Sequence, residues 1–329
     1  MQHFSKLIDK KNLLAFSAGV DSSALFFLLI EADIPFDIAF VNYGTRDQSL
    51  DEESYALELA KRYNIEVYIA KAPRYETHFE ANARAFRYDY FESLIETYSY
   101  DNLITAHQLN DQLEWLLMRL SRGAGLCELI GLEPHTERKT AKGVSYKLIR
   151  PLLDKTKQEL LIYLQSNNHK YFIDQSNKDK KYERNRFREA FSDPLLGQFT
   201  DGIKRSFNYL YRDKLELEDG IELLLSHYEL RVYALNKNSL KTRATDLALK
   251  ELGYLLSANQ RQEIERKDSI VIGGKWAVVY QSKRLYICPF INSSMPKRYK
   301  ELCRVSSMPI KIRAYCYSKD IRPLDVMGL

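Results

Sequence analysis

The chain is poor in cysteine, and this limits the chemistry that it can carry. It has 4 cysteines in 329 residues, and no two of them form a C-x-x-C pair. This spacing argues against a disulfide framework and against a zinc or iron–sulfur knuckle. We therefore expect reduced thiols and a cytoplasmic location. The cysteines are Cys127, Cys288, Cys303 and Cys316.

Long apolar runs are also missing. No stretch is long enough to cross a membrane, and the first 16 residues lack the apolar core of a signal peptide, so we expect no membrane contact. Glycine and proline are scarce, while 45% of the residues are hydrophobic and 28% are charged. This composition is typical of a folded globular protein, and the length suggests two domains.

A Walker sequence is absent, yet residues 12–23 have the features of a phosphate site. The apolar residues 13–16 predict a buried strand, and a helical pattern begins at Ser22. Small residues in such a turn present backbone N–H groups, hydroxyls and a helix dipole to an anion. The turn consists of Ser17, Ala18, Gly19, Val20, Asp21 and Ser22.

Strand and helix signals alternate through the first half of the chain. This order predicts an α/β fold with a doubly wound parallel sheet and helices on both faces. Ligands of such sheets bind at the carboxyl ends of the strands, where the Ser17 turn, Asn42 and His107 fall. The predicted strands are 13–16, 36–41, 65–70 and 102–106, and the predicted helices are about 22–32, 50–63, 82–98 and 110–120.

After residue 155 the pattern becomes helical, and near the C-terminus it changes to short strands. We predict a catalytic domain at 1–200, a linker helix at 201–218 and a small α+β domain at 219–329. An Asp193-Pro194 pair is expected to stop a helix. The expected helices are 155–165, 182–191, 203–225 and 244–265, and the expected strands are 269–272, 276–281 and 285–289.

A second polar element, TAHQLNDQLEWLLMRLSRGAG at 105–125, leaves a predicted strand and enters a helix. His107 lies at the end of the strand, beside the predicted nucleotide crevice. Asp111 and Glu114 are three residues apart, so they share one face of the helix.

Five segments together resemble the tRNA(Ile)-lysidine synthetases, which are N-type ATP pyrophosphatases. The 105–125 segment is similar to AHHxxDDQxETxLLRLxRGxG, and the turn at 17–22 is similar to the SGGxDS pyrophosphate loop. The others are VNYGTR at 41–46, NARAFRY at 82–88, and DQSN with YERNRFR at 174–188. The chain departs from the family patterns at Ala18, Tyr43, Gln108, Asn110 and Trp115. Ala18 replaces a glycine, and we expect it to be tolerated only with a negative φ.

The resemblance implies a PP-loop type of fold (an adenine-nucleotide alpha-hydrolase fold), with ATP and Mg²⁺ as cofactors. It also implies a ligation in two steps. ATP adenylates the C2 oxygen of the wobble cytidine in a CAU-anticodon tRNA(Ile) and releases pyrophosphate. The ε-amine of free L-lysine then attacks C2 and expels AMP, which leaves lysidine. A homodimer is allowed as well.

The same resemblance implies roles for the phosphate-binding residues. Asp21 holds Mg²⁺ and pyrophosphate, and the turn at 17–22 binds the nucleotide together with Asn42. Positive charge at the α-phosphate is expected from arginines, whose forked donors suit phosphate. The candidate arginines are Arg84, Arg87 and Arg188.

The lysine step needs a carboxylate that binds the ammonium group and accepts its proton. Asp111 and Glu114 are the candidates. His107 either orients the adenylate or takes part in proton transfer, and the sequence leaves both roles open.

Charge is distributed unevenly along the chain, whose net charge is +5. Residues 138–188 hold fourteen Lys or Arg against five Asp or Glu, and residues 297–329 hold eight against three. Basic segments with interleaved aromatic residues suit RNA, although a solvated surface is the alternative. We expect the C-terminal domain to bind tRNA.

Two other functions stay open. A tRNA thiolase would use the same ATP chemistry with sulfur as the nucleophile, but Cys127, the cysteine closest to the two motifs, is alone. A non-catalytic nucleotide- or RNA-binding module is the second alternative, because a fold does not fix a function.

Overall fold

The computed structural model describes residues 4, 7–44, 48–75, 77–173 and 183–328. The chain divides into two compact units, residues 1–211 and 212–329. In the described residues no helix is both long and apolar enough to cross a membrane. The family-like segment DQSN at 174–177 lies outside the described residues.

The first unit is built on a six-stranded sheet in the order β3-β2-β1-β4-β6-β5. Five strands are parallel, and β5 pairs antiparallel with β6 at one edge. The predicted doubly wound α/β fold is therefore confirmed, with one antiparallel edge strand added. The strands are β1 (Asn12–Phe16), β2 (Asp37–Asn42), β3 (Val67–Lys71), β4 (Asn102–Ile104), β5 (His135–Lys139) and β6 (Ser145–Ile149).

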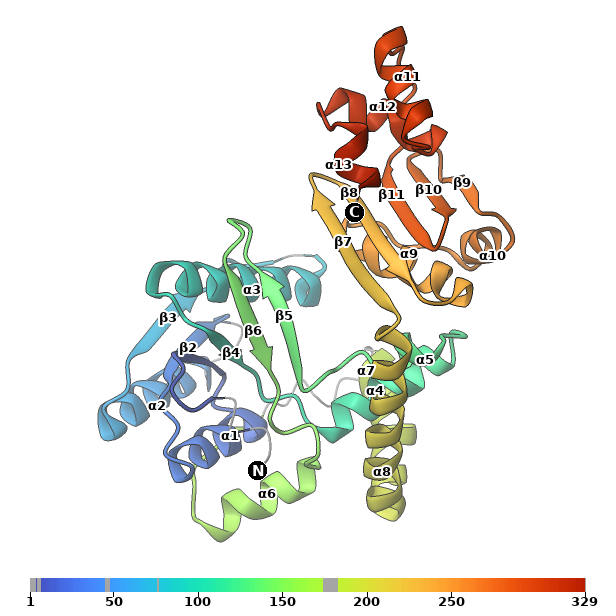
Figure 1. Ribbon diagram of the computed structural model, residues 1–329. Coiled ribbons are helices and arrows are strands. Elements are labelled where there is room, and N and C mark those ends of the chain that lie inside the picture. Colours follow the sequence, from blue (N-terminus) through green and yellow to red (C-terminus); the bar gives the residue numbers. More distant parts are fainter. Residues whose placement is uncertain (1–3, 5–6, 45–47, 76, 174–182, 329) are drawn as a thin grey trace. The chain divides into compact units, whose positions relative to one another are not determined.

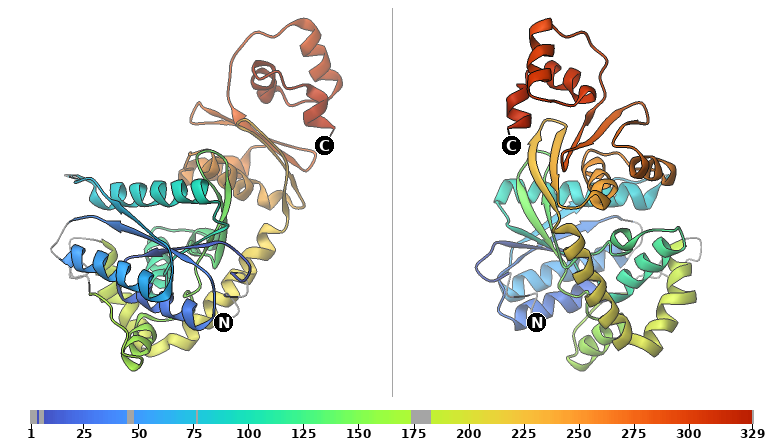
Figure 2. Two further views of the ribbon diagram at one scale, coloured as in Figure 1. Left: turned by 90° about the vertical axis from the view of Figure 1, so that its left-hand side faces the viewer. Right: turned by 45° about the vertical axis from the view of Figure 1, so that its right-hand side comes forward.

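Helices cover both faces of this sheet (Figures 1 and 2). Successive side chains of a strand point to opposite faces, so Leu14 and Phe16 of β1 pack under α1, α2 and α6, whereas Leu13 packs under α3. Both layers leave the carboxyl ends of the strands uncovered. These helices are α1 (Val20–Glu31), α2 (Gln48–Tyr63), α3 (Phe79–Tyr98) and α6 (Lys157–Ser166).

The remaining helices of this unit follow β4 or end the unit. Leu109 and Leu113 of α4 pack against Leu196 and Phe207 of α8. Here the expected stop at Asp193-Pro194 is wrong, because α8 begins at Asp193. Proline fits the first turn of a helix, where its missing N–H is not needed. The elements are α4 (Leu109–Leu120), α5 (Leu126–Leu129), α7 (Glu183–Phe187), the π-helical turn η3 (Arg188–Ser192) and α8 (Asp193–Glu218).

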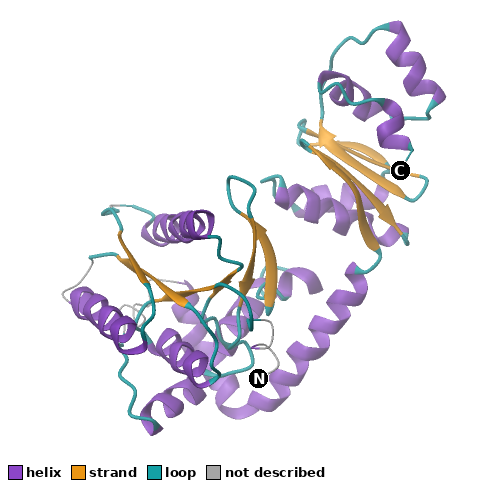
Figure 3. Ribbon diagram, turned by 60° about the vertical axis from the view of Figure 1, so that its left-hand side comes forward, coloured by secondary structure: helices purple, strands orange, loops and turns teal. Residues whose placement is uncertain are grey.

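The second unit is an antiparallel five-stranded sheet, in the order β7-β8-β11-β10-β9, with helices on both faces (Figure 3). Val278 packs toward α9 and α10, while its neighbours Ala277 and Val279 pack toward α11, α12 and α13. The elements are β7 (Ile221–His227), β8 (Leu230–Leu235), η4 (Asn238–Leu240), α9 (Lys241–Glu251), α10 (Ala258–Arg266), β9 (Ser269–Ile272), β10 (Trp276–Gln281), β11 (Arg284–Pro289), α11 (Lys297–Val305), α12 (Ile310–Ser318) and α13 (Pro323–Met327).

Two expected helices differ in this part of the chain. The helix expected at 203–225 ends at Glu218, and its last residues belong to β7. The helix expected at 244–265 is two helices, because Gly253 between them has a left-handed φ of 78°. The three strands expected after residue 268 are confirmed.

Candidate functional site

A cavity of about 520 Å³ opens at the carboxyl edge of the first sheet, and its size suits a small-molecule site. Its lining comes from the ends of β1, β2 and β4, from α3, and from the starts of α1, α4 and α6. Arg184 and Arg188 complete the lining from α7 and η3. The described parts of the segments that carry the predicted motifs thus contribute residues to one cavity.

The turn at residues 17–22 is closed by its own hydroxyl groups. Ser22 donates from Oγ to the Gly19 carbonyl over 3.2 Å, and the Ser17 backbone N–H donates to Ser22 Oγ over 3.2 Å. Gly19 is the N-cap residue of α1 and has an extended conformation, with φ −74° and ψ 171°. The turn therefore holds the start of a helix against the cavity, as an anion site requires.

Ala18 does not adopt the expected negative φ. Its φ is 58°, in the left-handed region that disfavours residues with a Cβ atom. The residue is fully buried, and its carbonyl accepts a hydrogen bond of 2.9 Å from the Phe172 backbone N–H. A glycine takes this conformation without strain, which accounts physically for the glycine in the family pattern.

Asp21 reaches the cavity from the first turn of α1. Its Oδ1 atom is buried and has no hydrogen-bond partner among the described residues. Burial raises the pKa of Asp21 from 3.8 to about 6, against the opposing effect of Lys157. An unpartnered carboxylate oxygen beside a phosphate turn fits a hard cation such as Mg²⁺, which binds through one or two carboxylates and substrate phosphates.

His107 follows β4 and lines the same cavity. Its Nδ1 lies 3.0 Å from the Thr105 hydroxyl oxygen. Burial, as the largest cause, and four nearby arginines together lower its pKa to about 3. The imidazole is therefore neutral near pH 7, and suits hydrogen bonding better than donation of a proton from a cationic form.

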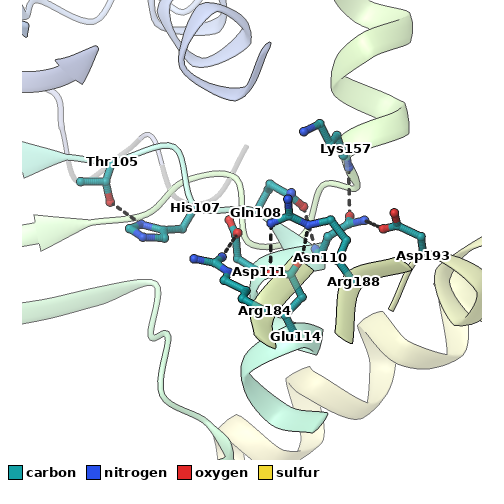
Figure 4. Close-up of polar contacts among 10 residues, drawn as sticks. All are labelled: Thr105, His107, Gln108, Asn110, Asp111, Glu114, Lys157, Arg184, Arg188 and Asp193. Carbon is teal, nitrogen blue, oxygen red and sulfur yellow. Dashed lines mark hydrogen bonds and ion pairs between the residues drawn. The ribbon is translucent and has the colours of Figure 1, made fainter. Parts of the chain in front are cut away.

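Asp111 and Glu114 do share one face of α4, as expected, but both are engaged by arginines (Figure 4). Glu114, 1% exposed, accepts from Arg184 Nε at 2.6 Å and from the Arg188 guanidinium at 3.1 Å. Asp111 pairs with Arg184 and also accepts a 2.9 Å hydrogen bond from the Gln108 backbone N–H. In this state both carboxylates are neutralised by the chain itself.

Asn110, which replaces a family aspartate, joins three helices. Its Nδ2 donates to Asp193 at the start of α8 over 2.8 Å, and its Oδ1 accepts from the Lys157 backbone N–H over 3.1 Å (Figure 4). The side chain is buried, and both the nitrogen and the oxygen of its amide group are hydrogen-bonded. It acts as a structural bridge between α4, α6 and α8.

Asn42 is placed differently from the prediction. Its side chain donates to the Ser49 carbonyl and to Glu53 of α2 over 3.3 and 2.5 Å, and accepts from the Gly44 backbone N–H over 2.8 Å. The neighbours Val41 and Tyr43 line the cavity, whereas Asn42 does not. Asn42 therefore shapes the loop, and its expected contact with nucleotide has no support here.

Trp115, which replaces a family threonine, packs outside the cavity. Its Nε1 donates to the Glu128 carbonyl over 2.8 Å, and the Arg119 guanidinium lies 4.4 Å from the ring centre. A Cβ on Gly131 would come within 2.1 Å of the indole. The large ring thus depends on a glycine at 131.

Most of the predicted site residues meet at the cavity, and several further ones were missed. Among the described residues, Arg87, His107, Asp111, Arg188 and the turn apart from Ala18 line it, whereas Glu114 does not. Lys157 was missed, although the capping box of Thr156 and Glu159 marks a helix start just before it. Tyr88 was also missed, because the sequence does not indicate whether an aromatic residue of a helix faces the core, the cavity or solvent.

A phosphate-binding turn at the carboxyl edge of a doubly wound sheet, beside a cationic cavity, defines a PP-loop ATP-binding protein. Residues 1–195 match the family described as a PP-loop domain. The chain is 43% identical over 312 residues to a tRNA(Ile)-lysidine synthase of Campylobacter jejuni (strain RM1221), with 94% of each chain covered. It is 40% identical over 326 residues, 98% of each chain, to that of Wolinella succinogenes. The chain belongs to the tRNA(Ile)-lysidine synthase family.

The solved structures show the fold. A U34-tRNA thiolase, NcsA from Methanococcus maripaludis, is 22% identical, covers 65% of this chain and 77% of its own, and superposes with a TM-score of 0.52. At this identity the likeness concerns the fold alone. Among the described residues, no group of three or more His, Cys, Asp or Glu could hold a metal ion.

Proposed function

We propose that the chain joins free L-lysine to C2 of the wobble cytidine of CAU-anticodon tRNA(Ile), using ATP through an adenylated tRNA. The observation that carries this proposal is the 43% identity to a tRNA(Ile)-lysidine synthase over 94% of both chains. The cavity supports it, because one edge of the sheet combines a phosphate turn, unpaired cations and two carboxylates.

In the first step the C2 oxygen of cytidine attacks the α-phosphate of ATP, and the bond to pyrophosphate breaks. The turn at 17–22 supplies N–H and hydroxyl donors to the departing pyrophosphate. Arg87 has no ion pair among the described residues, so its charge is available to the α-phosphate. Asp21 is the proposed Mg²⁺ residue, and the ion would neutralise charge on the leaving phosphates.

In the second step the ε-amine of lysine attacks C2, and the C2–O bond to AMP breaks. The amine must lose a proton, and a carboxylate is an acceptor of suitable type. Asp111 and Glu114 are the proposed carboxylates, and the geometry favours Asp111 because Glu114 is held on both oxygens by arginines. Neutral His107 is proposed to hydrogen-bond the adenylate.

The setting of the enzyme belongs to the same proposal. We place it in the cytoplasm, with 219–329 as a tRNA-binding domain and 201–218 as its linker helix. A homodimer would show in light scattering as twice the 38.5 kDa of one chain.

The test is incubation of the purified chain with ATP, labelled L-lysine and bulk tRNA. The expected result is pyrophosphate release and a labelled nucleoside in the tRNA digest. Pyrophosphate without lysine in the nucleoside would favour a thiolase, and no pyrophosphate would favour a non-catalytic module.

A further inference from the structure

Arginines of two kinds lie in the cavity and next to it. Arg184 and Arg188 are neutralised by Asp111 and Glu114 of α4. A second group has no ion pair with a carboxylate anywhere in the described part of the chain. This unpaired group consists of Arg84 and Arg87 of α3, Arg138 of β5 and Arg150, which follows β6.

Tyr88 brings two of the unpaired arginines together. The guanidinium carbons of Arg84 and Arg138 lie 4.9 and 5.0 Å from the centre of its ring. Contacts of this kind orient guanidinium groups without neutralising them. Tyr88 and Arg84 line the cavity, whereas Arg138 lies against the Tyr88 ring outside the lining.

Arg150 interacts electrostatically with both arginines of this pair and is buried, with a relative exposure of 4%. One amino group donates to the Glu133 carbonyl over 2.7 Å and to the Thr136 hydroxyl over 3.2 Å. Its buried Nε has no partner among the described residues. Burial, helped by Arg138 and Arg84 and opposed by Tyr88 and Glu133, lowers the pKa of Arg150 to about 10. The fold therefore keeps like charges together.

The unpaired arginines lead from the cavity toward the free edge of the sheet. Arg138 belongs to β5, the edge strand, where it pairs in register with Tyr146 of β6, and α3 packs on the same face (Figure 1). The pyrophosphate turn instead follows β1, in the middle of the sheet. A polymer whose phosphates continue beyond the cavity matches this arrangement better than one nucleotide does.

We propose that Arg84 and Arg138, held on Tyr88, bind phosphates of the RNA strand whose nucleotide enters the cavity. Arg150 adds positive potential behind them. This site rests on the proposed function, because it takes the tRNA substrate as its ligand, and it is separate from the turn that binds the phosphates of ATP.

The test compares Arg84→Gln and Arg138→Gln with Lys139→Gln, which removes the same charge from the next residue of β5. Side chains of adjacent strand residues point to opposite faces, and Lys139 is exposed. The measurements are the Kd for tRNA over a range of salt, the KM for tRNA and the KM for ATP. Thermal melting shows whether each variant is folded.

Each arginine variant is expected to raise the Kd and KM for tRNA about tenfold, which is the effect of losing one charge-assisted hydrogen bond. Its log–log salt slope should fall by about 0.7 to 0.9, while the KM for ATP stays unchanged. Lys139→Gln should change the Kd for tRNA less than twofold.

A raised KM for ATP with an unchanged Kd for tRNA would overturn the proposal and assign the arginines to nucleotide phosphates. An equal effect of Lys139→Gln would overturn it as well, because net charge alone would then explain binding. Direct tRNA binding is measured without product, so a failure to form lysidine would refute the proposed function without deciding this site.

Discussion

At the scale of single residues, the buried Asp21 carboxylate lowers the stability of the ligand-free chain at the position proposed to bind Mg²⁺. Its pKa is raised from 3.8 to about 6 in the folded chain, mainly by burial. As pH rises, the unfolded carboxyl loses its proton first, so stability falls between about pH 4 and 6 and stays lower above that range. We predict that Asp21→Asn abolishes pyrophosphate release but stabilises the ligand-free chain at pH 7 by up to about 3 kcal/mol.

Urea unfolding at pH 7 and pH 4, without ATP or Mg²⁺, measures this effect. The gain should fall to about a fifth at pH 4, where the folded carboxyl is protonated and the unfolded one is about half protonated. An equal gain at both pH values would mean that the charge of Asp21 does not cause it.

Ala18 provides a second test at this scale, because its φ of 58° is strained for any residue with a Cβ. Ala18→Gly should stay within about 1 kcal/mol of the parent, since relief of strain is offset by a freer unfolded chain and a lost buried methyl. Ala18→Val should cost more than about 2 kcal/mol, because a branched side chain fits neither the φ nor the buried space. Denaturant midpoints decide, and a stable valine variant would contradict the left-handed turn.

At the scale of elements, Asn110 connects α4, α6 and α8. We predict that Asn110→Asp destabilises the chain by about 2 kcal/mol at pH 7, because a carboxylate would face Asp193 where an amide now donates over 2.8 Å. Asp193→Asn alone should cost less than about 1 kcal/mol, and it should rescue most of the loss in the double variant. Additive losses in this cycle would show that the two side chains do not interact.

The elements also show how far the sequence predicts the fold. The order of the first half was predictable because its buried parallel strands alternate with helices. Strand β5, HTERK, carries no large apolar residue, and only its pairing with β6 makes it a strand. Strand β7, IELLLSH, continues the helical pattern of α8, so the sheet rather than local preference decides its structure.

The site follows the same division. The turn at 17–22, His107 and α4 were predictable because each belongs to one short segment with a recognisable pattern. The engagement of Glu114 by Arg184 and Arg188 was not, since these partners lie 70 and 74 residues away. The hydrogen bonds that hold the Asn42 side chain away from the cavity were not predictable, because they depend on Glu53 of α2.

At the scale of the whole molecule, each unit has its own hydrophobic core, so the two are separable in an experiment. We predict that a chain ending at residue 218 binds ATP as the full chain does, because the cavity belongs to the first unit. Its affinity for tRNA should fall at least tenfold, since the basic segment 297–329 is lost. Calorimetry with an ATP analogue and filter binding of tRNA at several salt concentrations measure the two. Unchanged tRNA affinity would show that the first unit reads the RNA alone.

The position of Trp115 in α4 has a practical consequence. The sequence has only two tryptophans, Trp115 in the first unit and Trp276 in the second. Trp276→Phe therefore leaves one tryptophan, in the helix that carries Asp111 and Glu114, and it can be excited selectively over the 23 tyrosines. Its emission would report rearrangement of that helix when ATP or lysine binds, in real time and without a label.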